Sequence, residues 1–294
     1  MNDISKESTK FFLEYEDEYE IDSLAEVIEE YLNKYSTYDH EELRIGCWIE
    51  AWDENNEADK IVKFIVENKD RFPNLKKIYF GDMDSEECEI SWIFNGDLAP
   101  LINNFNLNSF TAQGGMNLRF KNLKSNTLKE LIVISGGTSK ETIEDIALAE
   151  LPNLEKLEIY FGDSNYGFDA KIEDIQVFMN KSKYPKLKYL GLKNSEIQDE
   201  ICEKLFQSDI VETLEVLDIS FGVLSDKGAE VILNNLDKLS NLKEIDLTYN
   251  YISEDFLNKL EESFEKLNLK YSLDRDDVYD LDEDEEWRSP FISE

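Results

Sequence analysis

The chain has 294 residues, of which 41% are hydrophobic, so it is long enough and apolar enough to bury a core as one large domain or two ordinary ones. Its 66 acidic and 31 basic residues give a formal net charge of −35, which argues against direct binding to nucleic acid or an anionic membrane and favours a protein partner with a basic surface. A single histidine, His40, and three cysteines without C-x-x-C spacing argue against a zinc site and against most histidine-dependent hydrolase chemistry.

The N-terminal stretch predicts a short strand followed by an amphipathic helix that caps the rest of the fold. Phe11, Leu13 and Tyr15 alternate with other residues, as in a half-buried strand. Ser23 and Glu26 have the spacing of a helix capping box. The stretch lacks the long apolar run of a signal peptide, and no run approaches the length of a membrane span, so we expect a cytoplasmic protein. The apolar residues that follow Ser23 fall on one helical face: Leu24, Val27, Ile28, Tyr31 and Leu32.

One apolar pattern, L-x-x-L-x-L, recurs along the chain with a period of roughly 27 residues. Helix-like stretches follow the best copies, and Ser225 and Ser253 fit helix N-caps there. A doubly wound α/β fold also alternates strands with helices, but it rarely repeats this pattern in so many strands. We therefore predict an α/β fold, a leucine-rich-repeat solenoid (horseshoe) with a parallel sheet on the concave face and helices on the convex face. The copies span 75–80, 107–112, 128–133, 154–159, 187–192, 214–219 and 242–247, with a last copy at 264–269 and a weaker one around Leu43 and Ile45.

The stretch GDMDSEECEISW, residues 81–92, follows one of these copies and is rich in carboxylates. Its start fits an EF-hand calcium loop, because acids hold the first, third and fifth positions. The fit then fails, because Glu87 stands where a glycine is needed and Ile93 stands where the bidentate glutamate is needed. A looser carboxylate site for Ca²⁺ or Mg²⁺ in residues 82–89 stays open as an alternative. We expect instead an acidic loop at the C-terminal edge of the sheet.

The concave face supplies the candidate partner-binding residues. Because strand side chains alternate, the residues beside the second and third apolar positions are expected to point to solvent on that face. They are mixed in charge, and their tyrosines offer a large contact area with little entropy to lose. Tyrosine also simply suits strands, which is the competing interpretation. The candidates are Arg44, Lys77, Tyr79, Thr111, Gln113, Ile132, Glu158, Tyr160, Tyr189, Lys193, Asp218 and Asp246, together with Asp82 and Asp84 of the acidic loop.

Aromatic residues one position further along three strands allow two interpretations. Phe161, Phe221 and Tyr249 either form a cluster on the rim or pack under the turns. After them, residues 274–294 begin with a run of acids and are predicted to form an acidic tail, with residues 1–273 as a single repeat domain. The apolar ending around Phe291 leaves open whether this tail docks back.

Four segments carry a resemblance to a known family: RFPNLKKIYFGDMDSEECEISWI, YLGLKNSEIQDEI, TLEVLDISFGVLSDKGAEVIL and the ending EWRSPFISE. In these the chain resembles a family of bacterial cytoplasmic leucine-rich-repeat proteins with ribonuclease-inhibitor-like repeats. The resemblance spans nearly the whole chain and implies no activity, so it assigns neither catalytic residues nor a cofactor. The chain departs from standard repeats at the turns: Asn250 fits the usual asparagine, but glycine replaces it at Gly115, Gly136, Gly162 and Gly222.

The sequence as a whole favours a binding protein over an enzyme. We predict a non-enzymatic scaffold that binds a protein partner through its concave face and acidic rim, without a cofactor. One alternative is a metal-dependent protein or enzyme that uses the 82–89 carboxylates. A second is an acidic nucleic-acid mimic that occupies a DNA-binding protein.

Overall fold

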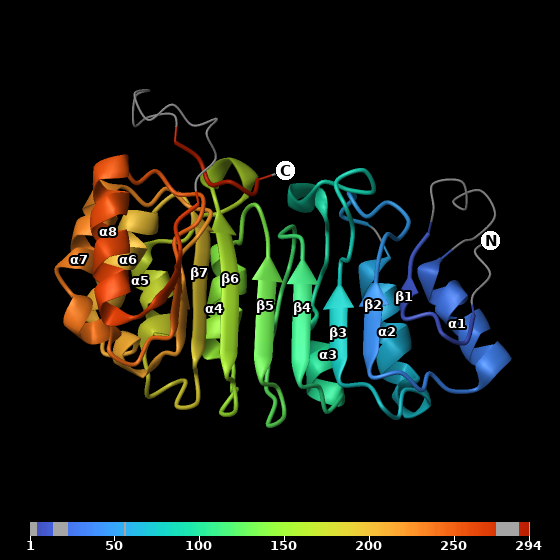
Figure 1. The fold of residues 1–294 in the computed structure, drawn as a ribbon. Helices are drawn as coiled ribbons and strands as arrows, with labels where there is room; N and C mark the ends of the chain where they lie inside the picture. Colours follow the sequence, from blue (N-terminus) through green and yellow to red (C-terminus); the bar gives the residue numbers. More distant parts are fainter. Residues whose placement is uncertain (1–4, 14–22, 56, 275–287, 294) are drawn as a thin grey trace. The chain divides into compact units, whose positions relative to one another are not determined.

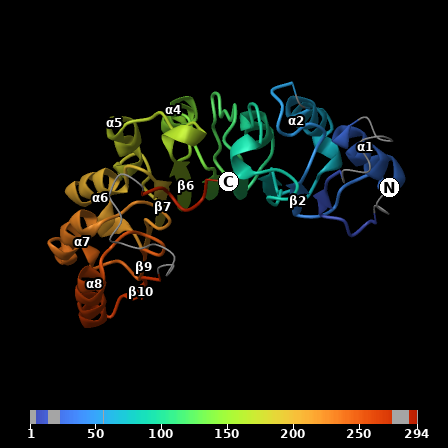
Figure 2. The same cartoon turned by 90° about the horizontal axis from the view of Figure 1, so that it is seen from above.

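The computed structural model describes residues 5–13, 23–55, 57–274 and 288–293, which form two compact units. Unit 1 consists of Met1–Ile134 and Glu144–Leu151, and unit 2 of Ser135–Ile143 and Pro152–Ser293. In each unit, parallel strands form one layer and helices cover one face of it (Figure 1, Figure 2). The predicted α/β leucine-rich-repeat solenoid is thereby confirmed, whereas the single domain over residues 1–273 stays a prediction. None of the helices in the described ranges is long and apolar enough to cross a membrane.

Unit 1 is built on parallel strands that follow one another in chain order. The register pairs Leu43 with Ile78, Ile78 with Phe110 and Phe110 with Leu131, so the second apolar position of each repeat forms one buried row. The strands are β1 (Lys10–Phe11), β2 (Glu42–Ile45), β3 (Lys77–Phe80), β4 (Ser109–Gln113) and β5 (Glu130–Ile134). The helices are α1 (Leu24–Tyr35), α2 (Ala58–Glu67) and α3 (Ala99–Asn104), with 3-10 turns η2 (Lys69–Arg71) and η3 (Ile90–Trp92).

Unit 2 repeats the arrangement with the same register. Leu157, Leu190, Leu217 and Ile245 pair in turn and are fully buried. The strands are β6 (Lys156–Gly162), β7 (Tyr189–Ser195), β8 (Val216–Asp218), β9 (Glu244–Asp246) and β10 (Lys270–Ser272). The helices are α5 (Ile172–Ile175), α6 (Gln198–Gln207), α7 (Asp226–Leu233) and α8 (Glu254–Leu267), with 3-10 turns η4 (Ser164–Tyr166), η5 (Gln176–Met179), η6 (Val211–Thr213) and η7 (Leu236–Leu239). Helix α4 (Lys140–Leu148) contributes residues to both units.

The N-terminal helix α1 has the predicted apolar face, and all of its predicted members are buried. Its cap differs in detail from a capping box. Ser23 lies at the N-cap and accepts from Ala25 N, while Leu24 N donates to Glu57 Oε1 at 2.8 Å. The second donor of the helix end is therefore satisfied by a residue of the next repeat. Tyr15, predicted to belong to the first strand, lies outside the described residues.

Helix starts in unit 2 are tied to the preceding repeat by aspartates. The Asp199 carboxylate accepts from Ser225 N at 2.8 Å, from Ser225 Oγ at 2.6 Å and from Gly228 N at 3.1 Å. One repeat later, Asp226 Oδ1 accepts from Ser253 N at 2.7 Å. Ser225 and Ser253 are the N-caps of α7 and α8, as predicted, and a carboxylate suits the positive end of a helix.

The predicted asparagine turn is present at Asn250. Its amide donates to Ile219 O and to Leu247 O at 3.0 Å each, and its Oδ1 accepts from Leu224 N at 3.0 Å. The side chain is 9% exposed and joins two consecutive turns. A single amide thus satisfies three backbone groups that the turns leave without strand partners.

Glycine at another turn position is required by a close backbone approach. The turn that contains Gly136 lies against the end of β6, where Thr138 N donates to Phe161 O at 2.7 Å and Asp163 N donates to Gly136 O at 3.0 Å. Gly162 has φ +77, and a Cβ built on it would lie 1.6 Å from Gly136 O. Only glycine fits both the backbone conformation and the space.

The predicted last copy of the repeat, residues 264–269, is wrong. Phe264 and Leu267 belong to helix α8, and Leu267 is 44% exposed. The helix continues because its apolar residues keep helical spacing, and it ends where Asn268 adopts a left-handed conformation with φ 54. The strand β10 follows, and Tyr271 takes the position next to Ile245.

Candidate protein-binding face

In unit 1, the strand register gathers the predicted partner-binding residues into one row. Arg44 pairs with Tyr79, Tyr79 with Thr111, and Thr111 with Ile132. All four are partly exposed, in contrast to the buried residues on either side of them in the strands. We call these four residues the strip. Their partial exposure agrees with the alternation expected for the concave face.

Polar contacts hold two residues of the strip, Arg44 and Tyr79, in place. Arg44 Nε donates to Asp82 Oδ2 at 2.7 Å, and the Arg44 guanidinium lies 4.8 Å from the centre of the Tyr79 ring. Tyr79 Oη donates to Gln113 Oε1, and Gln113 Nε2 donates to Met83 O at 2.6 Å. Burial, followed by the charge of Asp82, raises the pKa of Tyr79 to about 12. These side chains are held before any partner arrives, which lowers the entropy cost of binding.

The acidic stretch that follows β3 is largely paired with cations or with its own backbone. Lys10 Nζ lies 3.6 Å from Asp82 Oδ2 and 3.9 Å from Glu87 Oε2. Asp84 Oδ1 accepts from the N–H groups of Glu86 and Glu87 at 3.0 Å each. Among the described residues, no group of three His, Cys, Asp or Glu side chains is placed to hold a metal ion. The metal alternative therefore lacks a donor set in this part of the chain.

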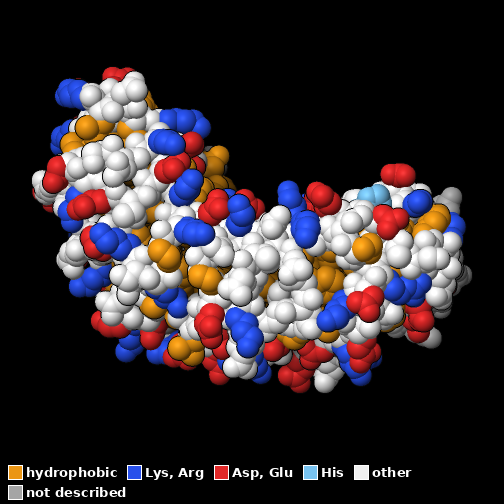
Figure 3. Space-filling view, turned by 90° about the horizontal axis from the view of Figure 1, so that it is seen from below, with side chains coloured by type: hydrophobic (Ala, Val, Ile, Leu, Met, Phe, Trp, Pro, Cys, Tyr) orange, Lys and Arg blue, Asp and Glu red, His pale blue; other side chains and the backbone are white. Residues whose placement is uncertain are grey.

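The remaining candidates of unit 1 differ in exposure, and charge is mixed around them. Lys77 and Asp84 are exposed, and Gln113 is half-buried. Lys and Arg side chains are interspersed among Asp and Glu over the face of the molecule shown in Figure 3.

In unit 2 the prediction of solvent-facing residues is wrong for a central group. Glu158, Tyr160, Lys193 and Asp218 are buried. Lys193 Nζ lies 2.7 Å from Asp218 Oδ2 and 3.3 Å from Glu158 Oε1, with side-chain exposures of 7%, 6% and 9%. These charged groups can be buried together, because Lys193 of β7 lies between a carboxylate of β6 and a carboxylate of β8 and pairs with both. We call Glu158, Lys193 and Asp218 the buried ion cluster.

Neighbouring side chains complete the hydrogen bonds of the buried ion cluster. Tyr189 Oη donates to Asp218 Oδ2 at 2.7 Å, and Ser220 Oγ donates to Asp218 Oδ1 at 2.6 Å. Lys156 Nζ lies 2.7 Å from Glu158 Oε2 and 4.1 Å from the centre of the Tyr189 ring.

The pKa shifts around the buried ion cluster follow from this geometry. Burial, followed by the charges of Asp218 and Glu158, raises the pKa of Tyr189 well above its ordinary range. Burial by itself lowers the pKa of Lys193, but Asp218, Tyr160 and Glu158 outweigh it and raise the pKa overall. The lysine is therefore a fixed cation and not a proton donor at neutral pH.

Because of Tyr79 and Tyr160, we expect the stability of the folded chain to fall at alkaline pH. Burial raises the pKa of Tyr160 to about 12, against the opposing charge of Lys193, and Tyr79 also reaches about 12. Both phenols hold their protons more tightly in the folded chain, so their contribution is complete below about pH 10 and is lost between about pH 10 and 12. We expect the melting temperature to fall over this range, and to fall less in a Tyr79→Phe/Tyr160→Phe variant. Equal losses in both proteins would contradict this account.

The rim aromatics divide between the two interpretations. Phe161 is buried and packs against Phe168, with ring centres 6.0 Å apart. Phe221 and Tyr249 are half-buried and stack on each other with ring centres 5.4 Å apart. The last strand candidate, Asp246, is half-buried, and its Oδ1 accepts from Thr248 N at 2.9 Å.

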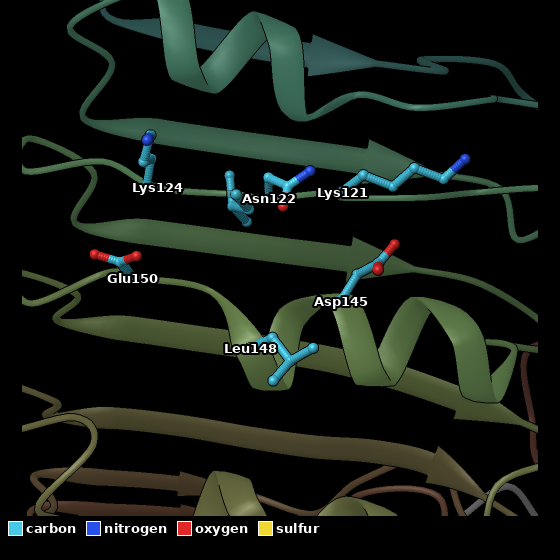
Figure 4. Close-up of a pocket in the computed structure, with 7 residues that line it drawn as sticks. Lys121, Asn122, Lys124, Asp145, Leu148 and Glu150 are labelled. Atoms are coloured by element: carbon cyan, nitrogen blue, oxygen red, sulfur yellow. The ribbon is translucent and has the colours of Figure 1, made fainter.

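A pocket of about 350 Å³ opens in unit 1 beside helix α4 (Figure 4). Lys121, Lys124 and Glu150 line it together with Asp145 and Leu148 of that helix. Asp145 already accepts two bonds from the guanidinium of Arg119, at 2.7 and 3.1 Å, and one from Phe120 N at 3.0 Å. Its carboxylate therefore joins helix α4 to the segment that contains Arg119 and Phe120.

The comparisons with known proteins agree with the repeat architecture. A family model described as a leucine-rich repeat matches residues 212–233. A solved structure, that of a Bacteroides fragilis protein from a structural genomics programme, is 36% identical, with a TM-score of 0.84. The match covers 93% of this chain and 76% of that one. A search of curated proteins found no match.

Proposed function

We propose that this chain, which like the similar Bacteroides fragilis protein belongs to the leucine-rich-repeat family, is a non-enzymatic cytoplasmic scaffold that binds a protein partner. Repeat arrays of this kind present extended surfaces on rigid strands, and such surfaces generally bind proteins. The observation that carries the proposal is the strip, in which Arg44 and Tyr79 are partly exposed yet held by Asp82 and Gln113.

The contact surface is assigned to unit 1. Arg and Tyr are the residue types that most often dominate binding energy at interfaces, and Ile132 adds an apolar neighbour two strands from Tyr79. Asp84 beyond the end of β3 is exposed and adds negative charge, and with a net charge of −35 this favours a partner with a basic patch. The buried ion cluster of unit 2 is left out of the contact surface, because its charges already satisfy one another.

The nucleic-acid mimic is less well supported than the scaffold. A mimic needs carboxylates in continuous rows that imitate phosphates. The face in Figure 3 instead carries Lys and Arg among the acids, and Asp82 is paired with Arg44 and Lys10.

The test compares the proteins that co-purify with tagged variants from the native host. We expect a Tyr79→Ala/Ile132→Ala variant to retain a wild-type partner at least about tenfold less, since hot-spot truncations cost about 2 kcal/mol or more. Lys63→Ala on helix α2, whose side chain is 73% exposed, is the matched control and is expected to retain it fully. Higher salt is expected to weaken the same interaction. Retention of the same proteins by the double variant would remove the strip as the contact surface.

A further inference from the structure

Two aromatic residues at the C-terminal edge of the unit 2 strands adopt a backbone conformation that is rare for their type. Phe221 has φ 65 and Tyr249 has φ 53, and Asn194 takes the same conformation at the matching position of β7, with φ 53. Asparagine tolerates this region, whereas bulky residues there are genuine outliers. Such strain persists where the surrounding structure fixes it, and it clusters at ligand-binding sites.

The outlier conformation places the two rings in one stacked row. Phe221 and Tyr249 stack with an interplanar angle of 23°, and Tyr160 continues the row with its ring centre 6.3 Å from Phe221. Lys193 Nζ lies 5.0 Å from the centre of the Phe221 ring. We call Asn194, Phe221, Tyr249 and Tyr251 the aromatic edge.

A short segment of the chain itself, residues 288–293, lies on the aromatic edge. Phe291 stacks on Tyr249 with ring centres 4.6 Å apart and an angle of 12°, and its ring centre is 5.8 Å from that of Phe221. Arg288 lies over the Tyr251 ring at 5.3 Å. The segment thus presents one aromatic and one cationic side chain to matching rings.

The aromatic edge also binds the backbone of this segment, without reference to its side chains. Asn194 hydrogen-bonds to both backbone groups of Ile292. Ile292 N donates to Asn194 Oδ1 at 2.8 Å, and Asn194 Nδ2 donates to Ile292 O at 2.6 Å. Phe291 N donates to Phe221 O at 2.8 Å, and Tyr251 Oη donates to the carbonyl oxygen of Ser289 at 3.1 Å. With the segment in place, Asn194 is buried and pairs with both backbone groups of one residue, as residues that hold a bound peptide backbone do.

We propose that the aromatic edge is a peptide-binding site for a protein segment in which an aliphatic residue follows an aromatic one, and that residues 288–293 occupy it as a replaceable internal ligand. The site is a surface separate from the strip, so the proposal goes beyond the function assigned above. Two features favour replacement over permanent packing: Phe291 remains 39% exposed, and the segment's backbone bonds to Asn194, Phe221 and Tyr251 are ones that another peptide can reproduce.

The test measures binding of a fluorescent peptide, Arg-Ser-Pro-Phe-Ile-Ser, to the full-length protein by anisotropy. A tethered segment has an effective concentration that reaches the millimolar range, so wild-type protein should bind the peptide weakly. A Phe291→Ala/Ile292→Pro variant loses the ring and the N–H that reach Tyr249 and Asn194, and we expect it to bind the peptide at least about tenfold more tightly than wild type. The same peptide with alanine in place of phenylalanine should bind less tightly, because it keeps the backbone bonds but loses the ring that stacks on Tyr249.

A third variant assigns the binding to the aromatic edge. Asn194→Gly, added to the double variant, keeps the left-handed backbone accessible but removes the amide, and it should abolish peptide binding. Circular dichroism checks that each variant is folded. The proposal is overturned if the folded double variant fails to bind the peptide, binds the alanine peptide equally well, or binds no more tightly than wild type. If the co-purification test showed that the strip binds no partner, the outcome of these peptide measurements would not change. The two proposals can therefore fail independently of each other.

Discussion

Replacing Gly162 by alanine is expected to lower the free energy of unfolding by about 2–5 kcal/mol. A left-handed conformation costs a residue with a Cβ about 1–2 kcal/mol, and overpacking costs about 1–3 kcal/mol more. The second cost arises here because the new Cβ would lie 1.6 Å from Gly136 O, a backbone atom that cannot rotate away. Urea unfolding followed by circular dichroism measures the change.

Gly167 provides the matched control, because it separates the two costs. Its φ is +106, but the nearest atom to a Cβ there is 3.6 Å away, an ordinary contact. Gly167→Ala should therefore show the conformational cost alone, about 1–2 kcal/mol. If the two variants unfold at the same urea concentration, the close approach of the Gly136 turn to β6 is not what makes Gly162 necessary.

The second large effect is expected for Lys193→Met, which removes the cation from the buried ion cluster. Methionine fills a similar volume but leaves the carboxylates of Glu158 and Asp218 buried without their shared partner. Breaking a buried ion pair from one side costs about 3–5 kcal/mol, so we expect a large fall in the urea midpoint.

An exposed lysine in the same unit serves as the comparison. Lys270 lies 2.8 Å from Glu244, but its side chain is 71% exposed, and Lys270→Met should leave the midpoint unchanged within error. A Glu158→Gln/Lys193→Met/Asp218→Asn variant should recover part of the loss, because no buried charge then lacks a partner. A Lys193→Met protein as stable as wild type would mean that the carboxylates reach water or a proton.

The strands and the core could be predicted because their signal is local. The pattern L-x-x-L-x-L fixes which residues of a strand are buried, and the register confirms it from Leu43 to Leu131 in unit 1 and from Leu157 to Ile245 in unit 2. The last copy failed for a local reason as well. Phe264, Leu267 and Leu269 match the strand pattern, but their segment also continues a helix, and the helix prevails until Asn268.

The site was harder to predict because its contacts join residues far apart in the sequence. Alternation indicates that Lys193 points away from the core, but it does not indicate that Glu158 and Asp218 from adjacent repeats will bury it. Asn194 was missed altogether, because its partner Ile292 is 98 residues away. A left-handed backbone at Phe221 and Tyr249 decides that they form a rim while Phe161 packs inside, and no composition rule predicts that choice.

Two aspartates each bind the start of the helix in the next repeat. This limits where repeats of such an array can be exchanged or deleted. Asp199 holds the start of α7, and Asp226 at that start holds Ser253 before α8. The interchangeable module is therefore not the strand with its own helix. It runs from one helix start to the next, and a chimaera joined at the strands separates each helix from the carboxylate that orients it. Grafts and deletions in this array should accordingly place their junctions at helix starts, as between Ser225 and Asp226, because the pairs Asp199–Ser225 and Asp226–Ser253 then each stay within one segment.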